Sequence, residues 1–170
     1  MLWSSTLVEV LRVSAKAGAV TDVEAINGDV FLTTHRDGAV QLLDSRSGDT
    51  SLLATLSAAV TSASHSGSAS YLISECGQLG YFDIRMPETP VQLTVPFTQP
   101  IDSLANCVKC EGSILAVGYQ NGGLQVFSLP DFRQIVKSKP HSDIVSGLDW
   151  QGGLLYSTCY SGELHQHSLA

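Results

Sequence analysis

Apolar residues along this chain gather in short runs separated by glycine, small and polar residues. Four such runs are VFLTT at 30–34, YLIS at 71–74, ILAVGY at 114–119 and LLYST at 154–158. They are rich in β-branched and aromatic residues and shorter than a typical helix, so each predicts a β-strand. No long stretch keeps a 3.6-residue apolar period between helix caps. The pattern therefore predicts an all-β protein.

A glycine follows each run at a nearly constant spacing along the chain. Gly38, Gly77, Gly122 and Gly162 are 39, 45 and 40 residues apart, and each is followed two positions later by Val or Leu. A second series of short motifs, VTDV, VTSA, IDSL and VSGL, begins at positions 20, 60, 101 and 145. Two independent series with a period of about 40 residues indicate four structural repeats. The glycines predict tight turns between neighbouring strands.

The first repeat contains four strand-like segments, which we name a, b, c and d in chain order: 20–26, 30–34, 39–44 and 51–56. Four antiparallel strands of this length form one blade of a β-propeller. We therefore predict a single propeller region over 1–170, with blades near 19–56, 59–95, 100–138 and 141–170. The last repeat ends at its third strand, and a further strand-like segment, 5–13, precedes the first repeat.

The repeats resemble the WD-repeat (tryptophan–aspartate repeat) β-propeller family over nearly the whole chain. The period, the turn glycines, FDIRMPETPVQL at 82–93 and PHSDIVSGLDW at 140–150 carry the resemblance. The Trp-Asp pair is absent, and Leu-Asp, Phe-Asp, Phe-Ser and His-Ser stand in its positions. The family ties each blade together with a buried hydrogen-bonded set of His, Asp, Ser or Thr, and Trp.

The resemblance implies that Asp37 with Thr34 and His141 with Ser157 supply parts of this set. His141 and Asp143 stand where the family ties strand a to its blade, so a structural or surface role is expected for them. A catalytic role is not expected, because no Ser or Cys nucleophile with a supporting base is identifiable in the sequence.

The repeats leave two alternatives for the completeness of the ring. Segment 5–13 could supply the missing outer strand of the last blade and close a ring of four blades. It could also be the outer strand of a preceding blade, and the chain would then be the C-terminal half of a longer propeller. We favour the second alternative. An open arc would leave an apolar blade face and strand edges unpaired, which favours association.

Composition and charge argue against some classes of binding partner. The chain has 170 residues, a hydrophobic fraction of 44% and a formal net charge of −7, without a Lys/Arg cluster. Such a surface repels a phosphate backbone and gives no polybasic membrane patch, so neither nucleic acid nor a membrane is an expected partner. No signal peptide and no membrane-spanning run is recognised. The four cysteines are then expected as free thiols, in the cytoplasm and/or the nucleus.

Several short motifs contain residue types that can bind metals or form turns. CVKC at 107–110 has a metal or redox spacing but no second ligand pair, and we place it at the end of strand a and the following turn. His165 and His167 share one face of a strand without a third ligand, so we expect no metal site there. SASHSGSAS at 62–70 predicts a mobile connection, and PETP and FTQP predict rigid turns.

The expected function is a noncatalytic scaffold or adaptor that binds other proteins of a complex through its propeller loops. No cofactor, metal or small-molecule substrate is expected. The alternatives are a propeller hydrolase or esterase, and an incomplete form of a larger propeller. The b–c and d–a loops of a propeller lie on one face, so the candidate contact residues are His35, Arg36, Asp37, Glu75, Gln120, Asn121, Ser142, Asp143 and Tyr160.

Overall fold

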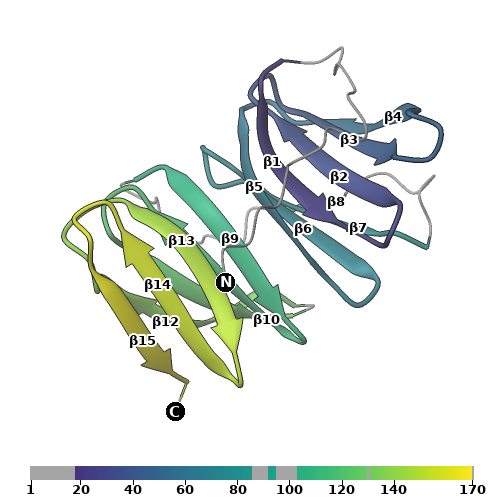
Figure 1. Cartoon of the computed structure of the whole chain (residues 1–170). Coiled ribbons are helices and arrows are strands. Elements are labelled where there is room, and N and C mark those ends of the chain that lie inside the picture. Colours follow the sequence, from purple (N-terminus) through teal and green to yellow (C-terminus); the bar gives the residue numbers. More distant parts are fainter. Residues whose placement is uncertain (1–17, 86–91, 95–102, 130, 170) are drawn as a thin grey trace, which may run out of the picture.

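A computed structural model of the chain describes residues 18–85, 92–94, 103–129 and 131–169 (Figure 1). The segment 5–13 and the PETP and FTQP motifs lie outside these residues, so the predictions made for them stay untested. Every regular element in the described part is a β-strand. No helix there is long and apolar enough to cross a membrane.

The strands form four separate antiparallel sheets, in agreement with the predicted repeats. The first sheet contains β1 (Val20–Ala25), β2 (Val30–His35), β3 (Ala39–Asp44) and β4 (Thr50–Thr55), and the second contains β5 (Val60–Ser66), β6 (Ala69–Ser74), β7 (Leu79–Asp83) and β8 (Gln92–Thr94). The third contains β9 (Ala105–Glu111), β10 (Ile114–Tyr119), β11 (Leu124–Ser128) and β12 (Arg133–Ser138). The fourth contains β13 (Val145–Gln151), β14 (Leu154–Cys159) and β15 (Leu164–Ser168).

The sheets follow one another as blades in an arc (Figure 1). Within each sheet the strands pair in chain order, and the strands β1, β5, β9 and β13 come first in their sheets. These first strands contact one another in succession, β1 with β5, β5 with β9 and β9 with β13. We call them the inner strands. The succession of three junctions between four sheets is the arrangement expected for propeller blades.

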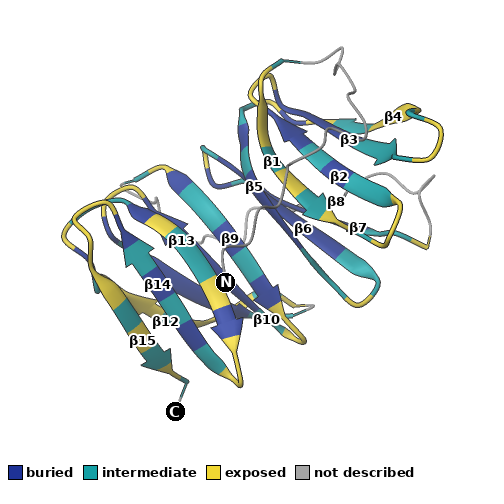
Figure 2. Ribbon diagram, viewed as in Figure 1, coloured by how far each residue is buried: buried dark blue, intermediate teal, exposed yellow. Residues whose placement is uncertain are grey.

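The apolar core is divided among the three junctions between neighbouring sheets. In the second sheet Leu72 packs toward the first sheet, whereas Tyr71 and Ile73 pack toward the third. Successive side chains of a strand point to opposite faces, so a strand that is covered on both faces needs a continuous apolar run. The strands β6 and β10 are accordingly buried on both faces, as Figure 2 shows.

The turn glycines have the backbone conformation that the spacing predicted. Gly38, Gly77, Gly122 and Gly162 all have positive φ, between 83° and 89°. At Gly38 and Gly122 the backbone after strand d also lies very close. A Cβ atom would come within 2.3 Å of the Leu56 carbonyl oxygen at the first position and within 2.1 Å of the His141 carbonyl oxygen at the second. Glycine is therefore required there for space as well as for conformation.

Polar side chains bridge the inner strands at each junction. The Asp22 carboxylate on β1 accepts hydrogen bonds from the Ser62 hydroxyl (2.9 Å) and the Ala63 amide (3.0 Å) on β5. The Ser64 hydroxyl on β5 in turn accepts one from the Cys110 amide on β9 at 3.1 Å. At the last junction the Asn106 amide group donates to the Val145 carbonyl at 2.8 Å. These bonds hold each blade in register with the next, and no sequence motif predicted them.

The prediction of a mobile connection at 62–70 was wrong. Most of this stretch belongs to β5 and β6, which are joined by a tight hairpin at Gly67 and Ser68. The small residues are needed because these strands face the neighbouring inner strands closely, and Ser62, Ser64 and Ser70 are buried. A serine-rich composition typical of a loop therefore reflects close packing between blades.

The prediction for CVKC was correct in part, because the motif lies in the second half of strand a, here β9, but it does not extend into the following turn. Cys107 approaches the Val145 carbonyl on β13 at 3.6 Å, whereas Cys110 lies 3.2 Å from the Ser64 hydroxyl on β5. The two thiols therefore point to opposite neighbouring blades and do not face one ion together. Burial raises the pKa of the Cys107 thiol to about 12 and also raises that of Cys110.

Candidate functional site

The loop face of the arc carries four equivalent positions, one in each sheet. The residue after strand b donates its backbone N–H to the residue before the inner strand of the same sheet. These bonds join Arg36 to Ala19 (2.9 Å), Glu75 to Ala59 (2.9 Å), Gln120 to Leu104 (2.9 Å) and Tyr160 to Ile144 (3.1 Å). All four donors were candidate contact residues. We call the group of Arg36, Glu75, Gln120 and Tyr160 the rim positions.

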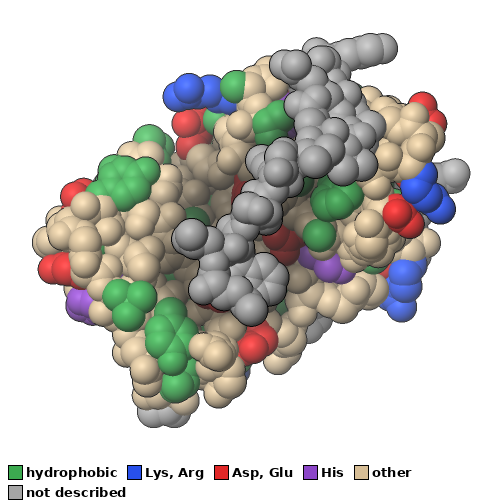
Figure 3. Space-filling view, viewed as in Figure 1, with side chains coloured by type: hydrophobic (Ala, Val, Ile, Leu, Met, Phe, Trp, Pro, Cys, Tyr) green, Lys and Arg blue, Asp and Glu red, His purple; other side chains and the backbone are tan. Residues whose placement is uncertain are grey.

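The rim positions differ in chemistry although their backbones are equivalent. Arg36, Gln120 and Tyr160 are exposed, with Tyr160 at 68%, and Glu75 is half-buried. One cation, one anion, one amide and one phenol therefore stand at repeated places. The other exposed apolar side chains are scattered, and Figure 3 shows them dispersed among polar groups on the face viewed there.

Three other candidate contact residues lie beside the rim positions. Asn121 and Ser142 are exposed and Asp143 is half-buried. The Asn121 side chain accepts a hydrogen bond from the Gly123 amide at 2.9 Å, and the Asp143 carboxylate accepts one from the Ile144 amide at 2.7 Å. Both side chains therefore also shape the turns on which they stand, as Asn and Asp commonly do.

The structure places His35 away from the surface. The His35 residue is fully buried. Its Nδ1 atom lies 3.0 Å from the Gly18 carbonyl and its Nε2 atom lies 3.1 Å from the Thr33 hydroxyl. These two contacts hold the ring inside the sheet. His35 is thus a structural residue in this geometry.

Asp37 is exposed, but its carboxylate is hydrogen-bonded to backbone amides. It accepts hydrogen bonds from the Gly18 amide at 2.7 Å and the Ala39 amide at 3.1 Å. These two N–H donors hold the pKa of the Asp37 carboxyl below its usual range. Asp37 thereby ties the start of the first repeat to its b–c turn.

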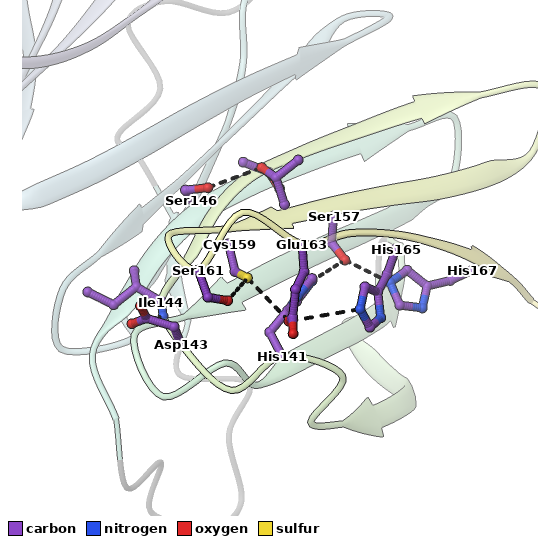
Figure 4. A network of polar contacts seen from close by, with 12 residues as sticks. His141, Asp143, Ile144, Ser146, Ser157, Cys159, Ser161, Glu163, His165 and His167 are labelled. Atoms are coloured by element: carbon purple, nitrogen blue, oxygen red, sulfur yellow. Dashed lines mark hydrogen bonds and ion pairs between the residues drawn. The ribbon is translucent and has the colours of Figure 1, made fainter.

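A second group of polar residues lies on the last sheet and on the segment before it (Figure 4). The His141 Nε2 atom is 2.7 Å from the Ser157 hydroxyl, and the same hydroxyl is 2.7 Å from the His167 Nε2 atom. His141 and Ser157 are buried. The predicted partnership of His141 with Ser157 is present, and His167 extends it. Burial lowers the pKa of His167.

Glu163 and His165 complete this group from the c strand and the turn before it. The Glu163 Oε2 atom lies 3.4 Å from His141 Nδ1, 3.9 Å from His165 Nε2 and 3.4 Å from the Cys159 thiol. Hydrogen bonds from Cys159 and His141 hold the pKa of Glu163 below its usual range. We call His141, Glu163 and His165 the two-histidine cluster. The three donor atoms lie within 4.8 Å of one another.

The sequence predicted parts of this cluster but not that they come together. Alternation places His165 and His167 on one face of a strand, and no third ligand was predicted there. The tertiary structure brings His141 beside His165, with ring centroids 4.4 Å apart, although 24 positions separate them in the sequence. The alternation Glu163, His165, His167 was a usable signal for Glu163, because residues two apart in a strand share a face.

The contacts also have the order Ser157, His141, Glu163, which is the order of a hydrolase triad. The Ser157–His141 contact is 2.7 Å, whereas the His141–Glu163 contact is longer, at 3.4 Å. The Ser157 residue has an exposed fraction of 0%. Its oxygen atom is held between two imidazoles. This environment suits a hydrogen-bond bridge better than a nucleophile, since a nucleophile has to be reached by its substrate.

Comparisons with known proteins establish the fold and not the family. No family model matches the sequence, and no curated protein matches it. The crystal structure of the computationally designed Ika4 protein is similar to this chain with a TM-score of 0.79 and 14% identity, over 97% of this chain and 100% of Ika4. The computationally designed Ika8 protein is similar with a TM-score of 0.72 and 14% identity, over 87% of this chain and 45% of Ika8. The chain is therefore all-β, with four antiparallel sheets like the blades of these designed propellers.

Proposed function

We propose that this chain is a noncatalytic scaffold that binds other proteins through its loop face. The observation that carries the proposal is the set of rim positions, which present four different side chains from four equivalent backbone sites. A rigid frame with varied exposed groups suits protein recognition, and Tyr and Arg are frequent anchors of interfaces. The negative net charge of −7 agrees with protein partners rather than nucleic acid.

We further propose that the propeller is of the WD-repeat type. In the last sheet His141 and Ser157 stand as in the family's hydrogen-bonded set, and His167 occupies the place that Trp has there. Ser161 stands at the position of Asp, and Glu163, two residues later, contacts His141 instead. The blade order is similar to the C-terminal half of WD repeat-containing protein seventy-three. That similarity suggests partners that are subunits of a multiprotein complex, in the cytoplasm and/or the nucleus, and no small-molecule substrate.

The test is a comparison of three tagged chains in cells. One is native, one carries Arg36→Ala, Gln120→Ala and Tyr160→Ala at rim positions, and one carries Thr50→Ala, Ser51→Ala and Gln134→Ala on the exposed outer strands β4 and β12. We expect proteins recovered with the native chain to be lost from the rim variant and kept by the outer-strand variant. Equal recovery by all three chains would contradict binding through the loop face.

A hydrolase is the second candidate, because Ser157, His141 and Glu163 contact one another in the order of a triad. A fluorophosphonate probe labels an activated serine covalently. Labelling of the native chain that disappears in Ser157→Ala would support the hydrolase, whereas an unlabelled native chain agrees with a scaffold.

A further inference from the structure

We propose that the two-histidine cluster of His141, Glu163 and His165 binds a divalent transition-metal ion of the zinc class. Two imidazole nitrogens and one carboxylate oxygen form a donor set that suits Zn²⁺, with one coordination position left for a further ligand. The proposal does not depend on the scaffold function.

The distances allow a metal site after a small movement. Ligand bonds to Zn²⁺ of about 2.0–2.2 Å place donor atoms roughly 3–3.5 Å apart. The His141 and Glu163 donors are already 3.4 Å apart, and the His165 and Glu163 donors are 3.9 Å apart. The side chains of Glu163 and His165 are 44% and 39% exposed, so they have room to turn toward an ion.

His141 is held in the orientation that a ligand needs. Its side chain has an exposed fraction of 0%, and its Nε2 atom is 2.7 Å from the Ser157 hydroxyl. The hydrogen bond to Glu163 uses the Nδ1 proton of His141, and Nε2 then accepts from the Ser157 hydroxyl. A metal ion would replace the Nδ1 proton, and Nε2–H would then donate to Ser157. A metal-bound histidine usually donates its other ring N–H in this way, which fixes the tautomer and the ring. Ser157 and His167 would then be the supporting groups behind the ligand.

A hydrogen-bonded network alone explains only part of the arrangement. It accounts for His141, Ser157, His167 and Glu163, which are linked by hydrogen bonds. It does not include His165, whose contacts within the described part of the chain are a 3.9 Å approach to Glu163 and ring contacts with His141 and His167. A metal ion gives that third donor a role.

The Cys159 thiol contacts Glu163 and is one of two candidates for the fourth ligand, although it lies outside the group of three donor atoms within 4.8 Å of one another. Its thiol lies 3.4 Å from Glu163 Oε2 and 2.9 Å from the Ser161 hydroxyl. Water or this thiolate would complete a tetrahedral site, and Co²⁺ as a spectroscopic substitute distinguishes the two. A thiolate-to-cobalt charge-transfer band indicates Cys159, and its absence indicates oxygen and nitrogen ligands only.

The experiment titrates zinc chloride into the chelator-treated full chain in competition with a chromogenic zinc indicator. All chains carry Cys76→Ser, because Cys76 is exposed and a free thiol binds zinc on its own. The variants are His165→Gln and Glu163→Gln, and the matched control is His65→Gln. His65 contacts Ser70 in the second sheet, away from the cluster.

We expect one ion per chain, and an affinity that falls by about tenfold or more in His165→Gln and Glu163→Gln but not in His65→Gln. Both cluster side chains are partly exposed, so the variants should fold, and metal-free unfolding curves verify this. Absence of zinc binding would overturn the proposal. Binding of equal strength in all variants would overturn it as well, because the ion would then lie elsewhere.

Discussion

At the scale of single residues, the turn glycines show how one residue type meets two different demands. All four have positive φ, but the space around them differs. Backbone oxygens crowd Gly38 and Gly122, whereas nothing lies within 4 Å of a Cβ atom at Gly162. The difference arises because strands d of the first and third sheets end beside their b–c turns, and the fourth sheet has three described strands.

The first prediction compares Gly122→Ala with Gly162→Ala. Both place a Cβ in an unfavourable conformation, which costs about 1–2 kcal/mol. Gly122→Ala also drives its Cβ to 2.1 Å from the His141 carbonyl oxygen, so its loss of unfolding free energy should be clearly larger. Urea denaturation of both variants measures the difference. Equal losses would show that the approach to His141 is absent in solution.

The second prediction concerns Asp37 and pH. Its folded-state pKa lies below the ordinary value of 3.8, so its stabilising effect is present above that value and is lost as the pH falls through the folded-state pKa. Asp37→Asn removes this titration. The native chain should therefore lose more stability than Asp37→Asn between neutral pH and pH about 3. Denaturant midpoints at both pH values provide the test, and parallel losses would contradict it.

At the scale of elements, the inner strands are connected by side chains that reach the next blade's backbone. The bonds from Asp22 to β5, from Ser64 to β9 and from Asn106 to β13 occur at successive junctions. Short polar residues on the inner strands therefore form hydrogen bonds between neighbouring blades. The inner strands connect the sheets as well as ending them. This explains why serines are tolerated and buried on β5.

The third prediction is that Asp22→Ala loosens the first junction. It removes the acceptor of the Ala63 amide and the Ser62 hydroxyl, and leaving such partly buried donors unpaired costs about 1–3 kcal/mol. Asp49→Ala is the control, because Asp49 stands exposed in the β3–β4 turn. Its effect should stay within about 0.5 kcal/mol. Chemical denaturation of both variants compares them, and similar costs would speak against the bridging role.

At the scale of the whole molecule, the first inner strand of the arc is less covered than the inner strands that follow it. On the inner strands Val60 and Val145 are fully buried, each with a preceding blade beside it. The corresponding Val20 on β1 is 53% exposed and Val23 is 56% exposed. Within the described residues, the face of β1 that points away from β5 is therefore uncovered, and such a face favours association.

The fourth prediction is that the isolated chain associates through this face of β1. Light scattering after size-exclusion chromatography should give a mass that rises with concentration, and Val23→Lys should lower it toward that of a monomer. Leu52→Lys is the matched control, because Leu52 is 61% exposed on the outer strand β4. A native chain that stays monomeric at all concentrations would instead indicate a self-contained propeller.

Much of the fold was predictable because a local pattern repeats. The turn glycines needed only their spacing, and the strands needed only their apolar runs. The site was less predictable. Arg36 and Tyr160 were placed correctly on the loop face, whereas His35 was misplaced, because its position at the end of β2 did not reveal that its ring turns into the sheet.

The amino-acid sequence by itself determined the four repeats, the strand class and the turns, because each depends on interactions between residues close together in the chain. The double burial of β6 and β10 was also encoded locally, in the continuous apolar runs YLIS and ILAVGY. Only the tertiary structure decided which polar groups meet. His141 and His165, and Asp22 and Ala63, become neighbours only when sheets fold and stack, and no local pattern specifies that geometry.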